Sequence, residues 1–248
     1  MDDNRLIKNF TVIESAYGKF LVNRHCAHQA EALIKTGRPH IDDELRKILA
    51  IVESLPTDCI LVDAGANIGL LSIPIADAIR SKGGTVHSFE VQRMLFYALC
   101  GGAALNDLDN LHAHHAALGS ASGSIPVPKL DYGRPQDFGM LSLKEQPDDA
   151  PSESVILMAL DSAGLPRLDF LKVDVEGMEI DVLRGARELI ARDRPWGWIE
   201  YWKVGIEPIR AELAEFGYKF YVMDKFNLLC APPERLASSR LSIKAPEA

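Results

Sequence analysis

The sequence predicts an α/β fold in which a mainly parallel sheet carries helices on both faces. Between Ile60 and Tyr201, short apolar runs alternate with longer segments that have helical spacing. A glycine-rich turn, Gly65 to Gly69, follows directly on the first of these runs. Strands separated by helices are joined by right-handed crossovers, which make neighbouring strands parallel. We therefore expect one α/β domain over residues 56–232.

Within this domain, the period of the apolar residues separates strands from helices. Strands are expected at 60–63, 85–90, 111–118, 155–160, 168–174, 196–201, 218–223 and 227–230. Helices are expected at 68–81, 91–105, 178–191 and 206–216. The periodicity is lost over 119–154, where only 125–127 and 140–143 are strand-like. We interpret 119–154 as a variable insertion that could shape a substrate site.

Two segments flank the domain. Residues 1–55 are expected to cover one edge of the core with a strand pair and two helices, at 10–22, 28–36 and 41–55. Residues 233–248 have no periodic pattern, so we expect a flexible tail.

Composition narrows the class of protein. Hydrophobic residues make up 47% of the 248 residues and charged residues 25%, which is typical of a soluble globular protein. The formal net charge of -8 argues against generic attraction to nucleic acid or to an anionic membrane. The four cysteines form no C-x-x-C pair, and no apolar run reaches the roughly 18 residues of a membrane span. We expect a cytoplasmic protein with buried thiols.

The segment Asp63-Ala-Gly-Ala-Asn-Ile-Gly69 predicts a nucleoside-binding turn. A backbone that can approach a ligand closely is expected at Gly65, Ala66, Asn67 and Gly69. A dinucleotide site favours G-x-G-x-x-G, whereas Leu70 stands where the last glycine would fall. The Asp63 carboxylate would repel a bound phosphate and attract an amino group. S-adenosylmethionine has such an ammonium group and no phosphate, so we expect it as the cofactor.

Glu90 ends the second strand of the domain, about 20 residues after the turn, where a carboxylate can accept both hydroxyls of a ribose. Val91 follows it directly and is expected beside the cofactor, and Ala117 is expected in the wall of the adenine site. NAD also carries a ribose. An NAD-dependent dehydrogenase is therefore the alternative, which the glycine spacing opposes.

Carboxylates that end two later strands are candidates for catalysis. Asp174 could accept a proton from a hydroxyl acceptor or orient it, and Glu200 could assist. Glu176 is expected to open a helix, where its charge would favour the N-terminus, or to act in catalysis. Lys172 precedes Asp174 by two positions and shares its sheet face, so we expect an ion pair. A divalent metal bridging Asp174 and Glu200 stays open, because two carboxylates are not diagnostic.

These motifs resemble those of the FkbM family of S-adenosylmethionine-dependent methyltransferases. The resemblance spans about 41–232 and rests on the segments 63–69, 88–90, 160–162, 169–179 and 182–186. Its most specific part is Lys172-Val-Asp-Val-Glu-Gly177. It implies a Rossmann-like class I methyltransferase fold with a mostly parallel seven-stranded sheet, in which the last hairpin supplies the antiparallel strand. It also implies O-methylation of a hydroxyl on a sugar, glycan or other small molecule.

The chain departs from the family pattern at two positions. Val91 stands where the family usually has proline, and Gly102 where it usually has asparagine. No family motif matches 119–154. A non-catalytic nucleoside-binding module with partners docked on 119–154 is therefore a further alternative, which the intact Asp63, Glu90 and Asp174 disfavour.

Overall fold

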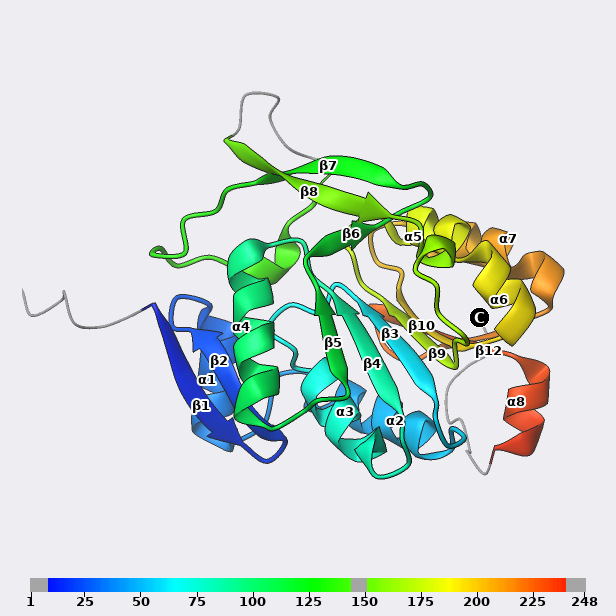
Figure 1. Cartoon of the computed structure of the whole chain (residues 1–248), viewed down its shortest axis with the longest axis horizontal. Helices are drawn as coiled ribbons and strands as arrows, with labels where there is room; N and C mark the ends of the chain where they lie inside the picture. The colour runs from blue at the N-terminus through cyan, green and yellow to red at the C-terminus, as the bar shows by residue number, and fades with distance from the viewer. Residues whose placement is uncertain (1–8, 144–150, 240–248) are drawn as a thin grey trace, which may run out of the picture.

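The centre of the molecule is a seven-stranded sheet, seen in a computed structural model that describes residues 9–143 and 151–239. The strand order is β11-β12-β10-β9-β3-β4-β5 (Figure 1). The strands are β3 (Ile60–Ala64), β4 (Thr85–Phe89), β5 (Leu111–His114), β9 (Phe170–Val173), β10 (Trp196–Glu200), β11 (Lys219–Val222) and β12 (Asn227–Ala231). β12 runs antiparallel to both of its neighbours, and the other adjacent strands are parallel. This confirms the predicted sheet, with the last hairpin supplying the antiparallel strand.

Helices cover both faces of this sheet and form two apolar cores. The first core includes residues of α1 (Ala27–Thr36), α2 (Asp42–Glu53), α3 (Ser72–Arg80) and α4 (Arg93–Leu105). The second includes residues of α5 (Glu179–Gly185), α6 (Arg187–Asp193) and α7 (Ile206–Leu213). Side chains alternate between the faces of a strand, so Leu61 lies in the first core and Val62 in the second. Among the described residues, no helix has both the length and the apolar character needed to cross a membrane.

The predicted N-terminal strand pair is β1 (Phe10–Ser15) and β2 (Gly18–Asn23), which lies against α4 (Figure 1). Asn106, at the end of α4, accepts a hydrogen bond from Lys19 N and donates one to Lys19 O. Gly102, where the family usually has asparagine, packs so closely on α3 that a Cβ atom would lie 2.6 Å from Ile73 Cδ1. The N-terminal segment is thus bound to the sheet through α4.

One predicted strand, 111–118, is instead two. β5 ends at His114, and after His115 the chain enters β6 (Ala116–Leu118), which belongs to a second, three-stranded sheet. That sheet also contains β7 (Gly123–Pro128) and β8 (Ser152–Met158), and it lies over the carboxyl ends of β3, β4 and β5 (Figure 1). His115 Nε2 lies 3.0 Å from Val91 O, next to the point where the chain leaves the main sheet. No proline, glycine or other turn residue in 111–118 reveals this change of sheet.

Three further predicted elements differ from the structure. The helix expected at 68–81 begins only at Ser72, because Asn67 and Gly69 have left-handed φ values of 52° and 88°. The helix expected at 178–191 is divided into α5 and α6 at Ala186. The strand expected at 140–143 was wrong, since 138–140 form a 3-10 turn, η2 (Phe138–Met140). Part of the insertion, 144–150, lies outside the described residues.

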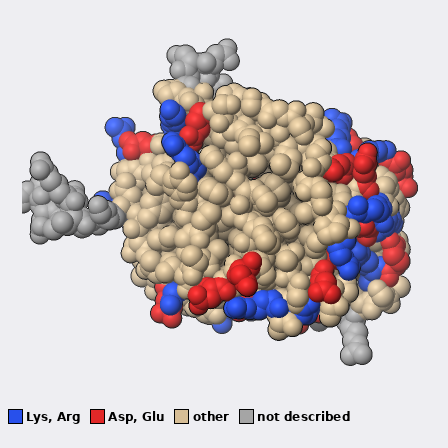
Figure 2. Space-filling view, viewed as in Figure 1, with Lys and Arg blue, Asp and Glu red and all other residues tan. Residues whose placement is uncertain are grey.

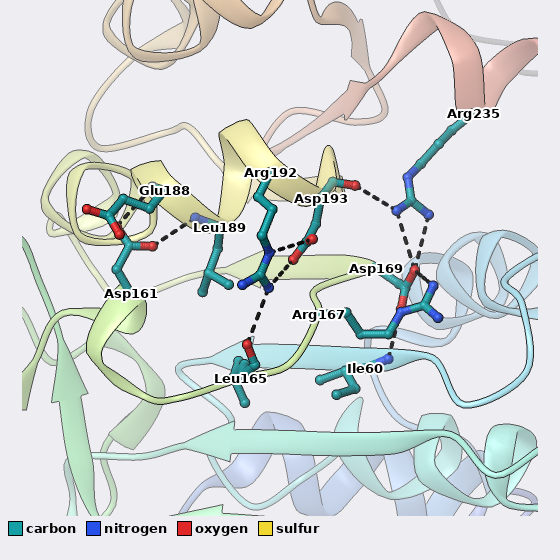
Figure 3. Close-up of polar contacts among 10 residues, drawn as sticks. All are labelled: Ile60, Asp161, Leu165, Arg167, Asp169, Glu188, Leu189, Arg192, Asp193 and Arg235. Atoms are coloured by element: carbon teal, nitrogen blue, oxygen red, sulfur yellow. Dashed lines mark hydrogen bonds and ion pairs between the residues drawn. The ribbon is translucent and has the colours of Figure 1, made fainter.

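The expected tail is wrong at its start, because 233–238 form α8 (Pro233–Ser238). Figure 3 shows how Arg235 of α8 approaches Asp169, which lies just before β9 and is fully buried. Asp169 Oδ2 accepts a hydrogen bond from Ile60 N at 3.0 Å. Its Oδ1 lies 2.6 Å from Arg167 Nη2 and 3.4 Å from Arg235 Nη2. Asp169 thereby joins β3, β9 and α8, whereas 240–248 lie outside the described residues.

We expect Asp169→Ala to lower the free energy of unfolding by about 3 to 5 kcal/mol, because it leaves buried donors and two guanidinium groups without their carboxylate. Urea unfolding measures this. Glu31→Ala, which removes an exposed ion pair with Lys35, should leave the midpoint unchanged. A loss of less than about 1 kcal/mol in Asp169→Ala would show that this carboxylate does not anchor α8.

Candidate active site

A cavity of about 560 Å³ opens at the carboxyl ends of the central strands. It contains ten of the predicted site residues, namely Asp63, Gly65, Ala66, Asn67, Glu90, Val91, Ala117, Asp174, Glu176 and Glu200. Gly69 is not in the lining. It lies behind the turn, where a Cβ atom would meet Leu99 and Ile73. The structure thus brings the predicted cofactor and catalytic residues into one space.

The strand register explains why these side chains meet. Asp63 on β3 is paired with Lys172 on β9, and Lys172 is paired with Trp198 on β10. The three side chains lie in one row, on the face that packs against α2. Two positions further along the same face are Asp174 and Glu200, at the ends of their strands. Asp63, Lys172 and Trp198 thus form a buried row across the sheet. Asp174 and Glu200 form the next row toward the carboxyl ends of the strands, where they line the cavity.

Lys172 connects the two rows. Its Nζ lies 3.1 Å from Asp63 Oδ1 and 3.5 Å from Asp174 Oδ2, which confirms the predicted ion pair. It also donates a hydrogen bond to Gly65 O at 2.8 Å. Burial lowers the pKa of Lys172, whereas the charges of Asp63, Asp174 and Glu44 raise it. The second effect is the larger, so the pKa of Lys172 lies above its ordinary value. Lys172 therefore stays charged although it is buried.

The glycine turn is held between β4 and β9. Gly65 N and Ala66 N both donate hydrogen bonds to Phe89 O, at 3.0 and 2.9 Å. Gly65 has φ 81°, and a Cβ atom there would lie 1.8 Å from Asp174 O. Only glycine fits this position, because a side chain would collide with the backbone that carries Asp174. Asn67 N points to Glu90 and donates a hydrogen bond to Glu90 Oε2 at 2.8 Å.

Glu90 is buried at the end of β4 with both oxygens bonded to the backbone. Its Oε1 accepts a hydrogen bond from Gln92 N at 2.8 Å, and its Oε2 accepts the bond from Asn67 N. Burial raises the pKa of Glu90 to about 7, although the two amide donors act in the opposite direction. The carboxylate is fixed in position, and each oxygen keeps a lone pair for a ligand.

Asp63, expected to face the amino group of the cofactor, has both oxygens engaged within the protein. Ser72 Oγ donates to Asp63 Oδ2 at 2.5 Å, and Ser88 Oγ donates in turn to Ser72 Oγ at 2.7 Å. Lys172 lies beside Asp63 Oδ1. Asp63 is 3% exposed. It supports the turn through Lys172, which also donates a hydrogen bond to Gly65 O.

Asp174, Glu176 and Glu200 form a carboxylate cluster in which one oxygen of each lies within 4.8 Å of the others. Burial, together with the charges of Asp174 and Glu176, raises the pKa of Glu200 to about 9. Glu200 Oε2 is buried, and it has no hydrogen-bond partner among the residues that the structure describes. Glu200 therefore holds its proton to higher pH than an ordinary glutamate does, and it presents an unpartnered oxygen at the cavity.

One interpretation of the sequence placed Glu176 at the start of a helix, and this was wrong. α5 begins at Glu179, whose carboxylate accepts hydrogen bonds from Gly177 N at 3.0 and 3.1 Å. Glu176 itself has φ 57° and forms an ion pair with Lys203. Its side chain is therefore turned to the carboxylate cluster and held there by Lys203.

Sequence reasoning missed the part of the lining that comes from the N-terminal segment. These residues are His28, Gln29, His40, Ile41 and Glu44. Glu44 Oε1 accepts a hydrogen bond from Trp198 Nε1 at 2.9 Å, and burial raises the pKa of Glu44 to about 7. A glutamate in the first turn of an amphipathic helix is typical of a solvent-facing residue, so no local signal indicated its position. Two aromatic residues, Trp202 and Phe226, also line the cavity.

The sheet order and the site at its carboxyl edge define a Rossmann-like class I methyltransferase fold. The FkbM methyltransferase domain matches residues 63–220. The chain therefore belongs to the FkbM methyltransferase family. The match begins at Asp63, so α1 and α2 lie outside it.

Two curated relatives are also methyltransferases, and a solved structure shares the fold. The chain is 30% identical to methyltransferase sdnD of Sordaria araneosa over 55% of this chain, and 27% identical to methyltransferase 1 of Beauveria bassiana over 54%. The matched regions span 64% and 61% of these relatives. The crystal structure of methyltransferase FkbM from Methylobacillus flagellatus aligns with a TM-score of 0.51 and 18% identity, over 70% of this chain and 43% of that chain, and shows the same fold.

Proposed function

We propose that this chain is an S-adenosylmethionine-dependent methyltransferase that methylates a hydroxyl group of a sugar, glycan or other small molecule. The observation that carries the proposal is the arrangement of one cavity, with Glu90 and the glycine turn on one side and Asp174 and Glu200 on the other. Membership of a methyltransferase family supports the reaction class and opposes the dehydrogenase alternative.

The residues around the turn fit the cofactor. The two lone pairs left on Glu90 would accept the ribose hydroxyls, and Val91 and Ala117 would border the adenine. The backbone of Gly65 to Gly69 would follow the amino-acid part, and Asp63 would hold this backbone through Lys172. When bound, S-adenosylmethionine supplies an electrophilic methyl group. The task of the protein is then to align the acceptor oxygen with that group and to exclude water.

We assign proton transfer to Asp174, whose carboxylate lies in the cavity beside the Lys172 ammonium group. It would accept the hydroxyl proton as the oxygen attacks. Glu200, which holds its proton to higher pH because of its raised pKa, would orient the same hydroxyl by hydrogen bonding. Glu176, held by Lys203, would position the other two carboxyl groups. We leave a divalent metal out of the proposal, because lysines already pair with Asp174 and Glu176.

Binding of 5'-methylthioadenosine, which has the ribose but no amino-acid group, tests Glu90. The dissociation constant should fall about tenfold from pH 6 to pH 7.5 and then level off, because the ionised carboxylate, with a pKa of about 7, accepts both hydroxyls. Calorimetry across this range measures it. Glu90→Gln should bind at least about tenfold more weakly at pH 8 and lose the pH dependence. A flat profile for the unmodified protein would contradict the assignment.

Release of S-adenosylhomocysteine in the presence of hydroxyl acceptors tests the chemistry. Asp174→Asn should lower kcat by about 10²- to 10⁴-fold, because the amide cannot accept the proton. Glu200→Gln should have a smaller effect, because its amide still donates a hydrogen bond. Both variants should bind S-adenosylhomocysteine as the unmodified protein does, and exposed Glu207→Gln serves as the control. Unchanged turnover in both variants would contradict the roles of Asp174 and Glu200.

A further inference from the structure

The ionisable groups of the cavity lining are mostly acidic. Among the described lining residues are seven carboxyl groups, Glu44, Asp63, Glu90, Asp137, Asp174, Glu176 and Glu200. The lining contains one lysine, Lys172, and no arginine. A cleft with low-dielectric walls and charges of one sign concentrates ions of the opposite sign. S-adenosylmethionine has a net charge of only about +1, from its sulfonium, so carboxyl groups of the lining remain available to a second cation.

Two of these carboxyl groups lie beyond the cofactor residues and have oxygens available to an acceptor. Glu44 Oε1 accepts a hydrogen bond from Trp198, which lies two residues before Glu200 on β10. Glu44 and Glu200 both line the cavity, and burial together with the charge of Asp174 raises the pKa of each. Among the described residues, the Glu44 side chain accepts a hydrogen bond only through Oε1, and Glu200 Oε2 is buried without a partner. Among the described lysines nearby, Lys172 pairs with Asp63 and Asp174, Lys203 pairs with Glu176, and Lys225 lies over the Phe226 ring.

An aromatic pair borders the same end of the cavity. Trp202 and Phe226 are 49% and 39% exposed, and their ring centroids lie 6.2 Å apart in an edge-on arrangement. Large exposed aromatic rings beside carboxylates suit a ligand that combines a cation with apolar or sugar-ring surface. Trp202 follows Glu200 by two positions in the sequence, and both residues line the cavity.

Resting on the proposed function, we infer that the acceptor is an amino alcohol or amino sugar, whose protonated amine binds between Glu44 and Glu200 while Asp174 takes the proton of its hydroxyl. Glu44 is then the residue that selects the acceptor. It comes from α2, outside the matched FkbM domain, so this selectivity belongs to the N-terminal segment of this chain.

The same charges oppose acceptors that carry phosphate or carboxylate groups, such as nucleotides and nucleic acids. A phosphate in this part of the cavity would meet the Asp174 carboxylate, and no arginine of the lining could bind it. On the face that Figure 2 shows, the described lysines and arginines are mixed with acidic residues along the margin and form no continuous basic surface. A nucleic-acid substrate would need such a surface.

The test uses matched probes that quench tryptophan fluorescence. The probes are the 4-nitrophenyl glycosides of 2-amino-2-deoxyglucose and 6-amino-6-deoxyglucose, each compared with its N-acetyl derivative, with and without S-adenosylhomocysteine. Trp196 and Trp198 are buried, so Trp202 is the tryptophan that a bound nitrophenyl group can approach. At least one amine should bind ten or more times more tightly than its acetylated form. Its binding should release protons, because the pKa values of Glu44 and Glu200 are raised in the free protein.

Glu44→Gln should abolish this preference and leave the affinity for the acetylated probe unchanged, since glutamine can still accept the hydrogen bond from Trp198. Glu53→Gln, an exposed change at the other end of α2, should keep the full preference. The inference is overturned if no amine binds more tightly than its acetylated form, including no binding at all, or if Glu44→Gln keeps the preference. The affinity for S-adenosylhomocysteine is measured on the same samples. A protein that does not bind S-adenosylhomocysteine would contradict the proposed function, independently of the result with the amine probes.

Discussion

The buried ion pair between Lys172 and Asp63 is the interaction on which the rest of the site depends. It crosses from β9 to β3 in the middle of the sheet, where an uncompensated charge would be costly. From this position Lys172 also binds Gly65 O and approaches Asp174. One ammonium group thus fixes the distance between the glycine turn, which would receive the cofactor, and the carboxylate that would take the proton.

The carboxyl groups around this ion pair differ in how fully they are bonded within the protein. Glu90 accepts a hydrogen bond at each oxygen, and Asp63 is held by a hydrogen bond at Oδ2 and by the Lys172 ion pair at Oδ1, which makes both rigid supports. Glu200 and Glu44 have raised pKa values caused by burial and keep free hydrogen-bonding capacity. Stability is therefore concentrated on the side of the proposed cofactor, and reactivity on the side of the acceptor.

The fold and the core of the site could be predicted because their signals are local. Strand and helix alternate within short windows, and Asp63, Glu90, Asp174 and Glu200 each end an apolar run. The second sheet could not be predicted, since β6 and β8 are separated by a segment without periodicity and pair only through tertiary structure. Glu44 was missed for a similar reason. Its position in the cavity depends on how α2 packs over Trp198. The residues next to Glu44 in the sequence do not indicate this packing.

The double variant Asp63→Asn/Lys172→Met tests the central claim most directly, because it removes both buried charges together. The Asp174 carboxylate also loses Lys172, but its side chain is 38% exposed and can be solvated by water. The account predicts a free energy of unfolding within about 2 kcal/mol of the unmodified protein, since replacing a buried ion pair is often nearly neutral. It also predicts, by calorimetry, at least about tenfold weaker binding of S-adenosylhomocysteine, a loss of about 1.4 kcal/mol. Unchanged affinity in a stably folded double variant would contradict the claim that this pair positions the site.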